Sequence, residues 1–467
     1  MKNLLRKFIP KKIRNLKHLF YAWYGAFKYS HPSEELFVIG VTGTSGKSST
    51  VFLLRQILES AGFRVGSLST IDFYIAGENK LNDQKMTMLG KMQIQKYLRE
   101  MVDKKCDIAI VETTSEGRVQ YRHRFINYDI MVLTNLYPEH IESHGSFEKY
   151  KRAKLDLFGY VSKCRKKLVT RIPACRQAWR GLYADDADNA DALIPKTVIV
   201  NGNSEYAEEF LDFNFEKKIS FAWKDQEICL SPARKKLTLL VGDIVATEKG
   251  LNFNIANTPF HTPLFGVHNA LNISSALSVA REFQIDWDVL QKAVANLKPI
   301  PGRVEFIKEA EKCGFKVIVD YAFEPKAMSA LYEVVDLLKP KRVVHVFGST
   351  GGGRDVSRRA VLGEIIGKKA NICIITDEDP YEDDPMEIIT DVANRVEKTG
   401  KILDKNLFKI LDRKEAIYKA IEIAEAGDLI LVTGKGSEQG MCVAGGKMIG
   451  WDDREVVREV IGKLYMI

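Results

Sequence analysis

Apolar runs that alternate with helical patterns dominate the chain from residue 37 onward. The run FVIGV leads into the glycine-rich segment TGTSGKSST and then into the helical pattern VFLLRQILESAG. Further apolar runs at 106–111 (CDIAIV) and 128–133 (YDIMVL) follow polar or helical stretches. Short apolar runs separated by helices are typical of a parallel sheet that is covered on both faces. The pattern therefore predicts an α/β domain that opens with a strand, a glycine loop and a helix.

The pattern changes twice farther along the chain. Residues 163–262 contain closely spaced apolar runs, among them KTVIV, KISFAW, KLTLLV and LNFNIA, which predict a β-rich insertion. Pro299, Pro301 and Gly302 mark a boundary. Beyond it, the runs KVIVDYA, RVVHVFG, NICIIT and DLILVTG alternate with helical patterns and predict a second, Rossmann-like α/β domain. The expected parts are an N-terminal segment over 1–36, a central domain over 37–298 and a C-terminal domain over 299–467.

The first 33 residues have a pattern of their own. They contain no acidic residue, and eight Lys and Arg side chains alternate with aromatic and aliphatic ones. This predicts a basic amphipathic helix that ends near His31 and Pro32. Two interpretations stay open: residues 1–33 contact an anionic membrane face or another surface peripherally, or they form a solvated helix packed loosely on the body.

Composition narrows the class of protein. The chain has 467 residues, of which 45% are hydrophobic and 28% charged, and this excludes a disordered chain and a small disulfide scaffold. Seven scattered cysteines without a CxxC pair predict reduced thiols. No run approaches the roughly 20 apolar residues of a membrane span. We expect a cytoplasmic monomer, with the inner membrane face as a second location, and no nucleic-acid partner, because a net charge of +8 is a mild excess at this length.

The segment from Thr42 to Ser49 has the residue types of a phosphate cradle. Glycines allow successive backbone N–H groups to face one anion, and the dipole of the following helix adds positive potential. Lys47 supplies a mobile cation and Ser48 a hydroxyl for Mg²⁺. A generic P-loop has Gly where this chain has Val41. A chance glycine turn therefore stays a second interpretation.

Two further side chains follow neighbouring strands. Glu112 comes after the run that ends at Val111, and His140 lies a few residues beyond the run that ends at Leu133. The carboxyl ends of parallel strands meet at the sheet edge where such folds bind ligands. A carboxylate and an imidazole can share a divalent cation there with Ser48 and ATP oxygens. The alternative is that each is an ordinary solvated or internally satisfied polar residue.

Nine motifs occur along the chain in a defined order. They are TGTSGKSS, VETTSEG, TNLYPEHIESHG, the RAK of Lys154, GVHNALN, PGR ending at Arg303, VDYAFEP, FGSTGGGRD and GKGSE. In this order and spacing they resemble the Mur ligases, most closely the UDP-N-acetylmuramoyl-tripeptide synthetases. The resemblance implies a central P-loop ATPase domain, a C-terminal Rossmann-like domain, and ligation of an amino acid to a peptide carboxylate through an acyl phosphate. ATP and Mg²⁺ would be required, and the product would serve peptidoglycan and cell wall biogenesis, and so cell shape and division.

The resemblance also implies roles for residues from separate parts of the chain. The ATP phosphates would contact Gly43, Thr44, Ser45, Gly46, Lys47, Ser48, Ser49 and Arg303. The adenine would lie near His268, Asn269 and Asn272, and the ribose near Asp320. One Mg²⁺ would be bound by Ser48 and Glu112, and a second by His140 and a carbamylated Lys154. The catalytic set would be Lys47, Lys154, His140 and Arg303. An ordinary surface lysine is the alternative for Lys154.

The acceptor side differs more from the family pattern. Positions that hold the muramoyl-peptide in the family are matched by Thr87, Thr114, Gln120 and Arg122, with unliganded polar loop residues as the alternative. Tripeptide synthetases carry a uridine-binding domain before the phosphate loop, whereas about 36 residues precede the first strand here. The acceptor therefore stays open between a UDP-linked and a lipid-linked form.

The amino-acid side differs as well. Relatives that add diaminopimelate have Asp-Asn-Pro-Arg where this chain has Glu378-Asp379-Pro380-Tyr381. Without that arginine, we expect Asp379, Tyr381 and Glu438 to attract the ammonium group of lysine or a similar amine. Near ATP, the usual Asn, His and His are replaced by Ser45, Phe323 and Ser437.

We therefore predict an ATP-dependent acid–amino-acid ligase that forms a carbon–nitrogen bond on a muramoyl-peptide-like precursor. One alternative is a related ligase that acts on a lipid-linked or folate-like acceptor. Another is a non-catalytic nucleotide-binding homologue that kept only the fold.

Overall fold

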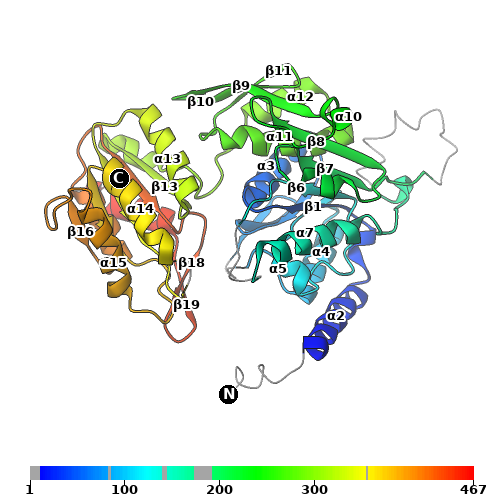
Figure 1. The fold of residues 1–467 in the computed structure, drawn as a ribbon, viewed down its shortest axis with the longest axis horizontal. Helices are drawn as coiled ribbons and strands as arrows, with labels where there is room; N and C mark the ends of the chain where they lie inside the picture. The colour runs from blue at the N-terminus through cyan, green and yellow to red at the C-terminus, as the bar shows by residue number, and fades with distance from the viewer. Residues whose placement is uncertain (1–10, 83–85, 139–144, 173–191, 354–355, 467) are drawn as a thin grey trace.

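The computed structural model describes the chain except residues 1–10, 83–85, 139–144, 173–191, 354–355 and 467. The described residues form two main sheets, one of 11 strands and one of six, with helices against both faces of each (Figure 1). A two-stranded hairpin, β18 (Gly440–Val443) and β19 (Lys447–Gly450), extends from the second part. The predicted α/β class is therefore confirmed.

The larger sheet has the strand order β11-β10-β9-β8-β7-β6-β1-β5-β2-β3-β4, and the strands from β9 to β2 in this order pair in parallel. The strands at its centre are β1 (Phe37–Thr42), β5 (Ile108–Glu112), β6 (Ile130–Leu133), β7 (Thr197–Asn201) and β8 (Lys217–Trp223). The strands toward its two edges are β2 (Val65–Leu68), β3 (Asp72–Ile75), β4 (Glu78–Leu81), β9 (Leu239–Thr247), β10 (Gly250–Ile255) and β11 (Thr258–Thr262). The carboxyl ends of β1, β5 and β6 consequently meet at one edge of the sheet.

The predicted β-rich insertion is corrected by this strand order. Its runs do form strands, but β7 pairs directly with β6, so the stretch continues the central sheet instead of forming a separate one. Within this stretch, the strands that pair antiparallel are β10 and β11. The physical reason is that β7 is buried on both faces, which suits the middle of a covered parallel sheet.

Two hydrophobic cores lie on opposite faces of this sheet because successive side chains of a strand alternate between faces. Ile39 of β1 belongs to the core under α3 (Lys47–Ser60), α11 (His268–Ala280) and α12 (Trp287–Ala295). Its neighbour Val38 belongs to the core under α4 (Lys91–Asp103), α7 (Phe147–Val161) and α9 (Ala207–Leu211). The short helices α5 (Ser115–Val119) and α10 (Pro232–Lys235) lie in connecting segments.

The second sheet has the order β12-β13-β17-β14-β15-β16 and is parallel except for β12. The four strands predicted from the sequence are present as β13 (Lys316–Asp320), β14 (Val343–Phe347), β15 (Ile372–Ile375) and β17 (Leu429–Thr433), with β12 (Glu305–Phe306) and β16 (Leu407–Lys409) outside them. One core packs under α13 (Pro325–Leu338), α14 (Val356–Lys369) and α15 (Pro385–Glu397), and the other under α16 (Arg413–Glu422) and α17 (Asp453–Tyr465).

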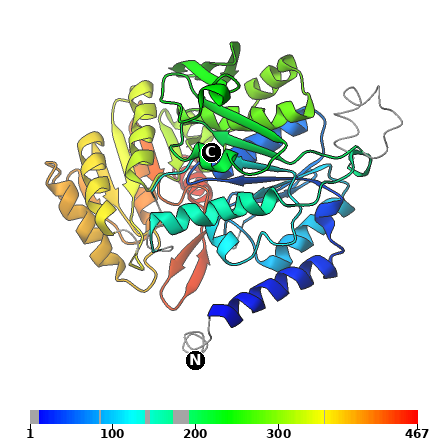
Figure 2. The ribbon, with the colours of Figure 1, turned by 45° about the vertical axis from the view of Figure 1, so that its right-hand side comes forward.

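The predicted N-terminal helix is α2 (Lys11–Lys28), which extends from the body of the molecule (Figures 1 and 2). It packs against α4 through small residues: Ala22 and Ala26 are buried, and a Cβ on Gly25 would lie 3.1 Å from the Met92 backbone. After α2 in the sequence, His31 adopts a left-handed conformation (φ 49°), and the 3₁₀ helix η1 (Pro32–Glu34) then leads into β1. None of the helices in the described part of the chain combines the length and the apolar character of a membrane span.

A buried carboxylate links the amino ends of the central strands. Asp129, just before β6, accepts hydrogen bonds from the backbone N–H of Val38 (2.9 Å), from Lys196 Nζ (2.9 Å) and from Lys167 Nζ. Lys167 also donates to the Leu36 carbonyl at 2.8 Å. Burial lowers the pKa of the Lys167 ammonium, and the charge of Asp129 opposes that shift. One negative charge thus compensates two buried cations.

Replacing this carboxylate is expected to destabilise the fold. Asp129→Asn keeps the shape of the side chain but leaves the Lys167 and Lys196 ammonium groups without a counter-charge, which should cost about 3–5 kcal/mol of unfolding free energy in urea titrations. The matched control is Asp243→Asn, which removes a solvent-exposed partner of Lys224 at 3.5 Å and should leave the midpoint unchanged. Equal midpoints for the two variants would contradict this description of the Asp129 cluster.

Candidate functional site

The glycine loop between β1 and α3 fits its surroundings only with glycine at two positions. Gly46 has φ 75° and caps α3, and a Cβ there would lie 2.6 Å from Asn272 Oδ1 of α11. At Gly43, a Cβ would lie 1.9 Å from Thr134 Oγ1, beyond β6. Side chains would therefore fill the space over the loop, whereas glycine leaves the backbone open to a ligand.

A side chain that the sequence analysis missed shapes this loop. Asn135 Oδ1 accepts hydrogen bonds from the backbone N–H groups of Thr44 (3.1 Å) and Ser45 (2.9 Å), and its Nδ2 donates to Ser45 Oγ at 3.1 Å. Tyr150 of α7 donates to Thr44 Oγ1 at 3.1 Å. Because these N–H groups are already bonded, an anion would be bound by the N–H groups that open α3, which have no acceptor within the helix. Asn135 belongs to the TNLYPEH motif, which was the available signal.

Two lysines approach the loop from different helices. Lys47, the first residue of α3, donates from Nζ to the Thr44 carbonyl at 2.8 Å. Lys154 of α7 donates to the Gly43 carbonyl at 2.8 Å and lies 4.8 Å from the centre of the Tyr150 ring. Only 1% of Lys154 is exposed, so the alternative of an ordinary surface lysine is wrong. The loop is consequently flanked by two ammonium groups.

The structure brings Ser48 and Glu112 together, as the common sheet edge predicts. Ser48 Oγ donates to Glu112 Oε1 at 3.0 Å, and Glu112 is 1% exposed. The other carboxylate oxygen accepts from the backbone N–H (2.8 Å) and the hydroxyl (3.1 Å) of Thr70, which the sequence analysis did not single out. Thr70 Oγ1 in turn lies 3.0 Å from Thr87 Oγ1. A continuous chain of hydrogen bonds therefore joins Ser48 to a predicted acceptor residue.

The donor set at Ser48 and Glu112 fits one Mg²⁺, because hydroxyl and carboxylate oxygens are the ligands that this ion prefers. Mg²⁺ keeps several waters and substrate phosphates in its shell, so two protein donors suffice. Within the described ranges, no group of three or more His, Cys, Asp or Glu residues could hold a metal ion. His140, predicted for a second cation, lies outside the described residues.

Arg303 opens the second part of the chain with an unsatisfied donor. Its guanidinium lies 4.2 Å from the centre of the Tyr321 ring, and its Nε is buried without a hydrogen-bond partner in the part of the chain that the structure describes. Asp320, buried beside it, accepts from the backbone N–H groups of Val304 and Ala322, both at 2.7 Å. Burial raises the pKa of Asp320, and the charge of Arg303 opposes that shift. A buried guanidinium N–H without an acceptor fits a site for a phosphate oxygen.

The residues predicted near adenine open α11. Asn269 donates to the Phe265 carbonyl at 2.7 Å, and Asn272 donates to Asn269 Oδ1 at 3.1 Å, whereas His268 is exposed. The contact between Asn272 and Gly46 places this end of α11 against the phosphate loop. Asn269 and Asn272 thus have partners within the protein, and His268 is the exposed member of the three.

The other predicted acceptor residues lie after β5. Thr114 caps α5 by accepting from the Gly117 N–H at 3.0 Å. Gln120 Oε1 accepts from Arg122 Nη2 at 2.8 Å and Arg122 Nε at 3.2 Å. Burial lowers the pKa of the Arg122 guanidinium. Among the described residues, the hydrogen-bond partners of this partly buried cation are neutral side chains and a carbonyl, so Arg122 is suited to bind a carboxylate.

In the second part, Asp379 and Glu438 come together around a buried lysine that the sequence analysis missed. Lys435 Nζ lies 3.0 Å from Asp379 Oδ2 and 2.7 Å from Glu438 Oε2, and Tyr321 donates to Glu438 Oε1 at 2.9 Å. Tyr381 lies nearby in a left-handed conformation (φ 54°), with its N–H bonded to the Cys442 carbonyl. The predicted acidic pair therefore already contains one cation of the chain, and Lys435 lies in the GKGSE motif that carried the signal.

Direct contacts join the two parts of the molecule. Lys326 Nζ, in α13, lies 5.3 Å from the centre of the Tyr137 ring, which follows β6 and so belongs to the edge that carries the phosphate loop. Phe265 and Phe306 pack with ring centres 4.9 Å apart at the start of the second sheet. Residues of both parts are thus available to one site, which suits chemistry on more than one substrate.

The comparisons with known proteins agree with this arrangement. Residues 41–185 match the Mur ligase middle domain, and residues 302–436 match the Mur ligase glutamate ligase domain. The chain is 31% identical over 447 residues to a UDP-N-acetylmuramyl-tripeptide synthetase from Roseiflexus sp., with 93% of this chain and 80% of the relative covered. It is 33% identical over 438 residues to a protein of the same name from Borreliella burgdorferi, with 93% and 78% covered.

A solved structure adds information on the fold alone. Folylpolyglutamate synthase from Mycobacterium tuberculosis superposes with a TM-score of 0.64 at 15% sequence identity, covering 95% of both chains. The two family domains, the identity to the tripeptide synthetases and the phosphate loop beside Glu112 lead to the same conclusion. The chain belongs to the Mur ligase family and is an ATP-dependent acid–amino-acid ligase.

Proposed function

We propose that this ligase adds an amino acid to the carboxylate of a muramoyl-peptide-like precursor of peptidoglycan. The observation that carries the proposal is the buried Ser48–Glu112 pair beside a glycine loop whose backbone is fixed by Asn135. The names of the relatives from Roseiflexus and Borreliella support a muramoyl-peptide acceptor. We further propose the division into residues 1–36, 37–298 and 299–467.

The chemistry follows from the poor reactivity of a carboxylate toward amines. ATP supplies a phosphoryl group that makes one carboxylate oxygen a leaving group. An oxygen of the acceptor forms the new bond to phosphorus and ADP leaves; the amine nitrogen then bonds to the carbonyl carbon, inorganic phosphate departs with that oxygen, and the amine releases a proton. Charge spreads over the phosphoryl oxygens in both steps, so positioned cations lower the barriers. Lys47 is the cation at the loop, and Arg303 supplies a second from the other part of the chain.

Within the proposal, Ser48 and Glu112 hold one Mg²⁺, which neutralises phosphate charge when bound. Thr70 fixes both the Glu112 carboxylate and the Thr87 hydroxyl. The geometry of the metal donors is thereby linked to the acceptor segment. Arg122, also beside that segment through its contact with the Met88 carbonyl, binds the acceptor carboxylate.

For the amino acid, we propose the surroundings of Asp379, Tyr381 and Glu438. Two carboxylates, Asp379 and Glu438, lie around the Lys435 ammonium in this segment, and the proposal is that carboxylate oxygens here also bind the side-chain ammonium of the amino acid. Burial raises the pKa of the adjacent Glu378 to about 7, so this carboxyl changes charge near neutral pH. Lysine or a similar amine fits these carboxylates better than an amino acid with a second acid group.

The acceptor itself can be UDP-linked or lipid-linked, and the exposed face of α2 favours a protein that works at a membrane. Its exposed large side chains are Leu16, Phe20, Tyr21, Trp23, Tyr24 and Phe27. Phe20 and Tyr24 stack one turn apart, as do Trp23 and Phe27, so the aromatic face is continuous. With no acidic residue in the first 33, this helix matches an anionic lipid surface in both polarity and charge. We propose that α2 lies on such a surface.

Lys47→Ala should lower turnover about 100-fold or more, because the substitution removes a positioned cation from a site that stabilises developing charge. The measurement is phosphate release that depends on both an acceptor and an amino acid, with UDP-linked, lipid-linked and folate acceptors tried in parallel. Lys249→Ala, an exposed lysine on another surface, is the control and should turn over normally. A near-normal rate for Lys47→Ala contradicts the assigned role, and no release by the unmodified protein with any acceptor favours the non-catalytic alternative.

Lys154→Ala tests whether this lysine works as a carbamate or as an ammonium group. If the side chain is carbamylated, short carboxylic acids added to the assay should restore part of the lost activity. Lys151→Ala, one turn earlier on α7 and paired with Glu209 at 3.0 Å, is the control and should remain active. If acetate and formate do not restore activity to Lys154→Ala, the carbamate is contradicted. The role left for Lys154 is then the hydrogen bond from its ammonium group to the Gly43 carbonyl.

Phe20→Gln combined with Phe27→Gln should weaken sedimentation with anionic vesicles about tenfold or more, because two apolar groups no longer enter the interface. The two side chains are 53% and 63% exposed, so folding should be unaffected. Leu237→Gln, at a side chain 76% exposed outside α2, is the matched control. Equal vesicle binding by both variants would refute membrane contact through α2.

A further inference from the structure

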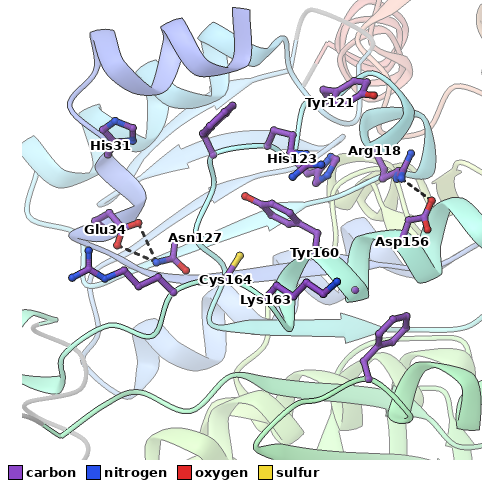
Figure 3. A pocket seen from close by; sticks show the side chains of 15 residues that line it. His31, Glu34, Arg118, Tyr121, His123, Asn127, Asp156, Tyr160, Lys163 and Cys164 are labelled. Carbon is purple, nitrogen blue, oxygen red and sulfur yellow. Dashed lines mark hydrogen bonds and ion pairs between the residues drawn. The ribbon is translucent and has the colours of Figure 1, made fainter. Parts of the chain in front are cut away.

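The part of the molecule that contains the 11-stranded sheet has a large cavity. None of the residues given a role in ligation above lines it. It has a volume of about 630 Å³ and lies between the segment after α5, helix α7 and the 3₁₀ helix that follows α2 (Figure 3). Asn127, on its wall, precedes β6, whereas the phosphate loop follows the end of β1. The cavity therefore reaches the amino side of the sheet, and Arg118 and Tyr121 on its wall follow the carboxyl end of β5. Its size is that of ligand sites in proteins, which run from about 300 to 1,000 Å³.

Positive charge is in excess around the cavity. Its lining includes four cations, Arg118, Arg124, Lys163 and Arg165, and two carboxylates, Glu34 and Asp156. Asp156 pairs with Arg118 at 2.6 Å, and Glu34 accepts hydrogen bonds from Asn127 at 3.0 and 3.1 Å (Figure 3). Among the described residues, the remaining three cations, all exposed, form no ion pair. An anion can therefore be bound without breaking an existing pair.

Two buried polar atoms of the wall lack partners. His123 is 3% exposed, and its Nδ1 has no hydrogen-bond partner among the described residues; the same holds for Nε of Arg118. Burial, reinforced by the charges of Arg124 and Arg118, lowers the pKa of His123 to about 3, so the imidazole is neutral at pH 7. Buried polar atoms are normally bonded, and two orphans on one wall indicate missing polar partners.

Aromatic rings form the rest of the lining. Tyr160 meets His123 edge to face with ring centres 4.9 Å apart, and the guanidinium of Arg124 lies 5.1 Å from the centre of the Tyr160 ring. Tyr121, Phe125 and Phe213 also contribute to the wall. Figure 3 shows Tyr160 projecting between the Arg118–Asp156 pair and the Glu34–Asn127 pair. A flat ring can thus stack here while charged oxygens reach the basic rim.

From these features we propose that this cavity binds a phosphate-bearing ligand of nucleotide size. Arg124, Lys163 and Arg165 contact the phosphate oxygens, His123 and Arg118 supply hydrogen bonds at the wall, and the aromatic rings hold the apolar or planar part of the ligand. The phosphate can belong to a free nucleoside diphosphate or to a lipid headgroup, since η1 connects the cavity to α2. The site is separate from the ligation chemistry and does not depend on it.

Calorimetry with UDP and with pyrophosphate tests this site, with saturating ADP present to occupy the phosphate loop. The triple variant Arg124→Ala, Lys163→Ala, Arg165→Ala should bind both probes at least about tenfold more weakly, because it removes three charge-assisted hydrogen bonds to phosphate oxygens. The matched control removes three exposed lysines that do not line the cavity, Lys218→Ala, Lys236→Ala and Lys249→Ala, and should bind like the unmodified protein.

A second arm uses vesicles that contain phosphatidic acid. A selective loss of vesicle binding by the cavity variant assigns the phosphate to a lipid headgroup, whereas a loss confined to UDP and pyrophosphate assigns a free ligand. If the unmodified protein binds none of these probes, or if both triple variants bind equally, the cavity site is refuted. Lys47→Ala should keep full UDP binding at the cavity, so a failed ligase assay and a failed cavity assay remain distinguishable.

Discussion

The parallel pairing of β1 with β5 and β6 is the constraint on which the site depends. It brings the ends of three segments, distant along the chain, to one edge of the sheet. Glu112 at the end of β5 reaches Ser48 of α3, and Asn135 beyond β6 reaches the backbone of Thr44 and Ser45. Each of these contacts joins segments at the ends of two different strands. The geometry of the glycine loop therefore depends on how rigidly β1 is paired with β5 and β6. Asp129 stabilises the opposite ends of the same strands.

The residues proposed to bind phosphate and those proposed to bind the amine differ in charge. At the glycine loop, Lys47 and Lys154 point to backbone carbonyls and provide positive potential for phosphate oxygens. In the second part, Asp379 and Glu438 lie beside Lys435, and the proposed function assigns their carboxylates to the amine of the amino acid. Under the proposed function, a site assembled from both groups would bind the nucleotide and the amino acid at once, which holds the reacting groups close together.

Much of the fold and part of the site were predictable from the sequence. Apolar runs identify both parallel sheets, and the positions of Ser48 and Glu112 after strands predict their meeting at one edge. The interpretation of residues 163–262 as an insertion was wrong, because a strand pattern does not show which neighbour the strand pairs with. In the structure, β7 pairs with β6 of the central sheet. Thr70, Asn135 and Lys435 were missed because they lie in loops, whose shape no periodic pattern encodes.

The central claim is that a carboxylate is activated by transfer of a phosphoryl group to one of its own oxygens, which later leaves with the phosphate. The most direct measurement labels the acceptor carboxylate with ¹⁸O and follows the label by mass spectrometry through one turnover. Activation as an acyl phosphate places one labelled oxygen in the released phosphate and leaves the other in the new amide. Released phosphate that carries no label, with product still formed, would contradict the account.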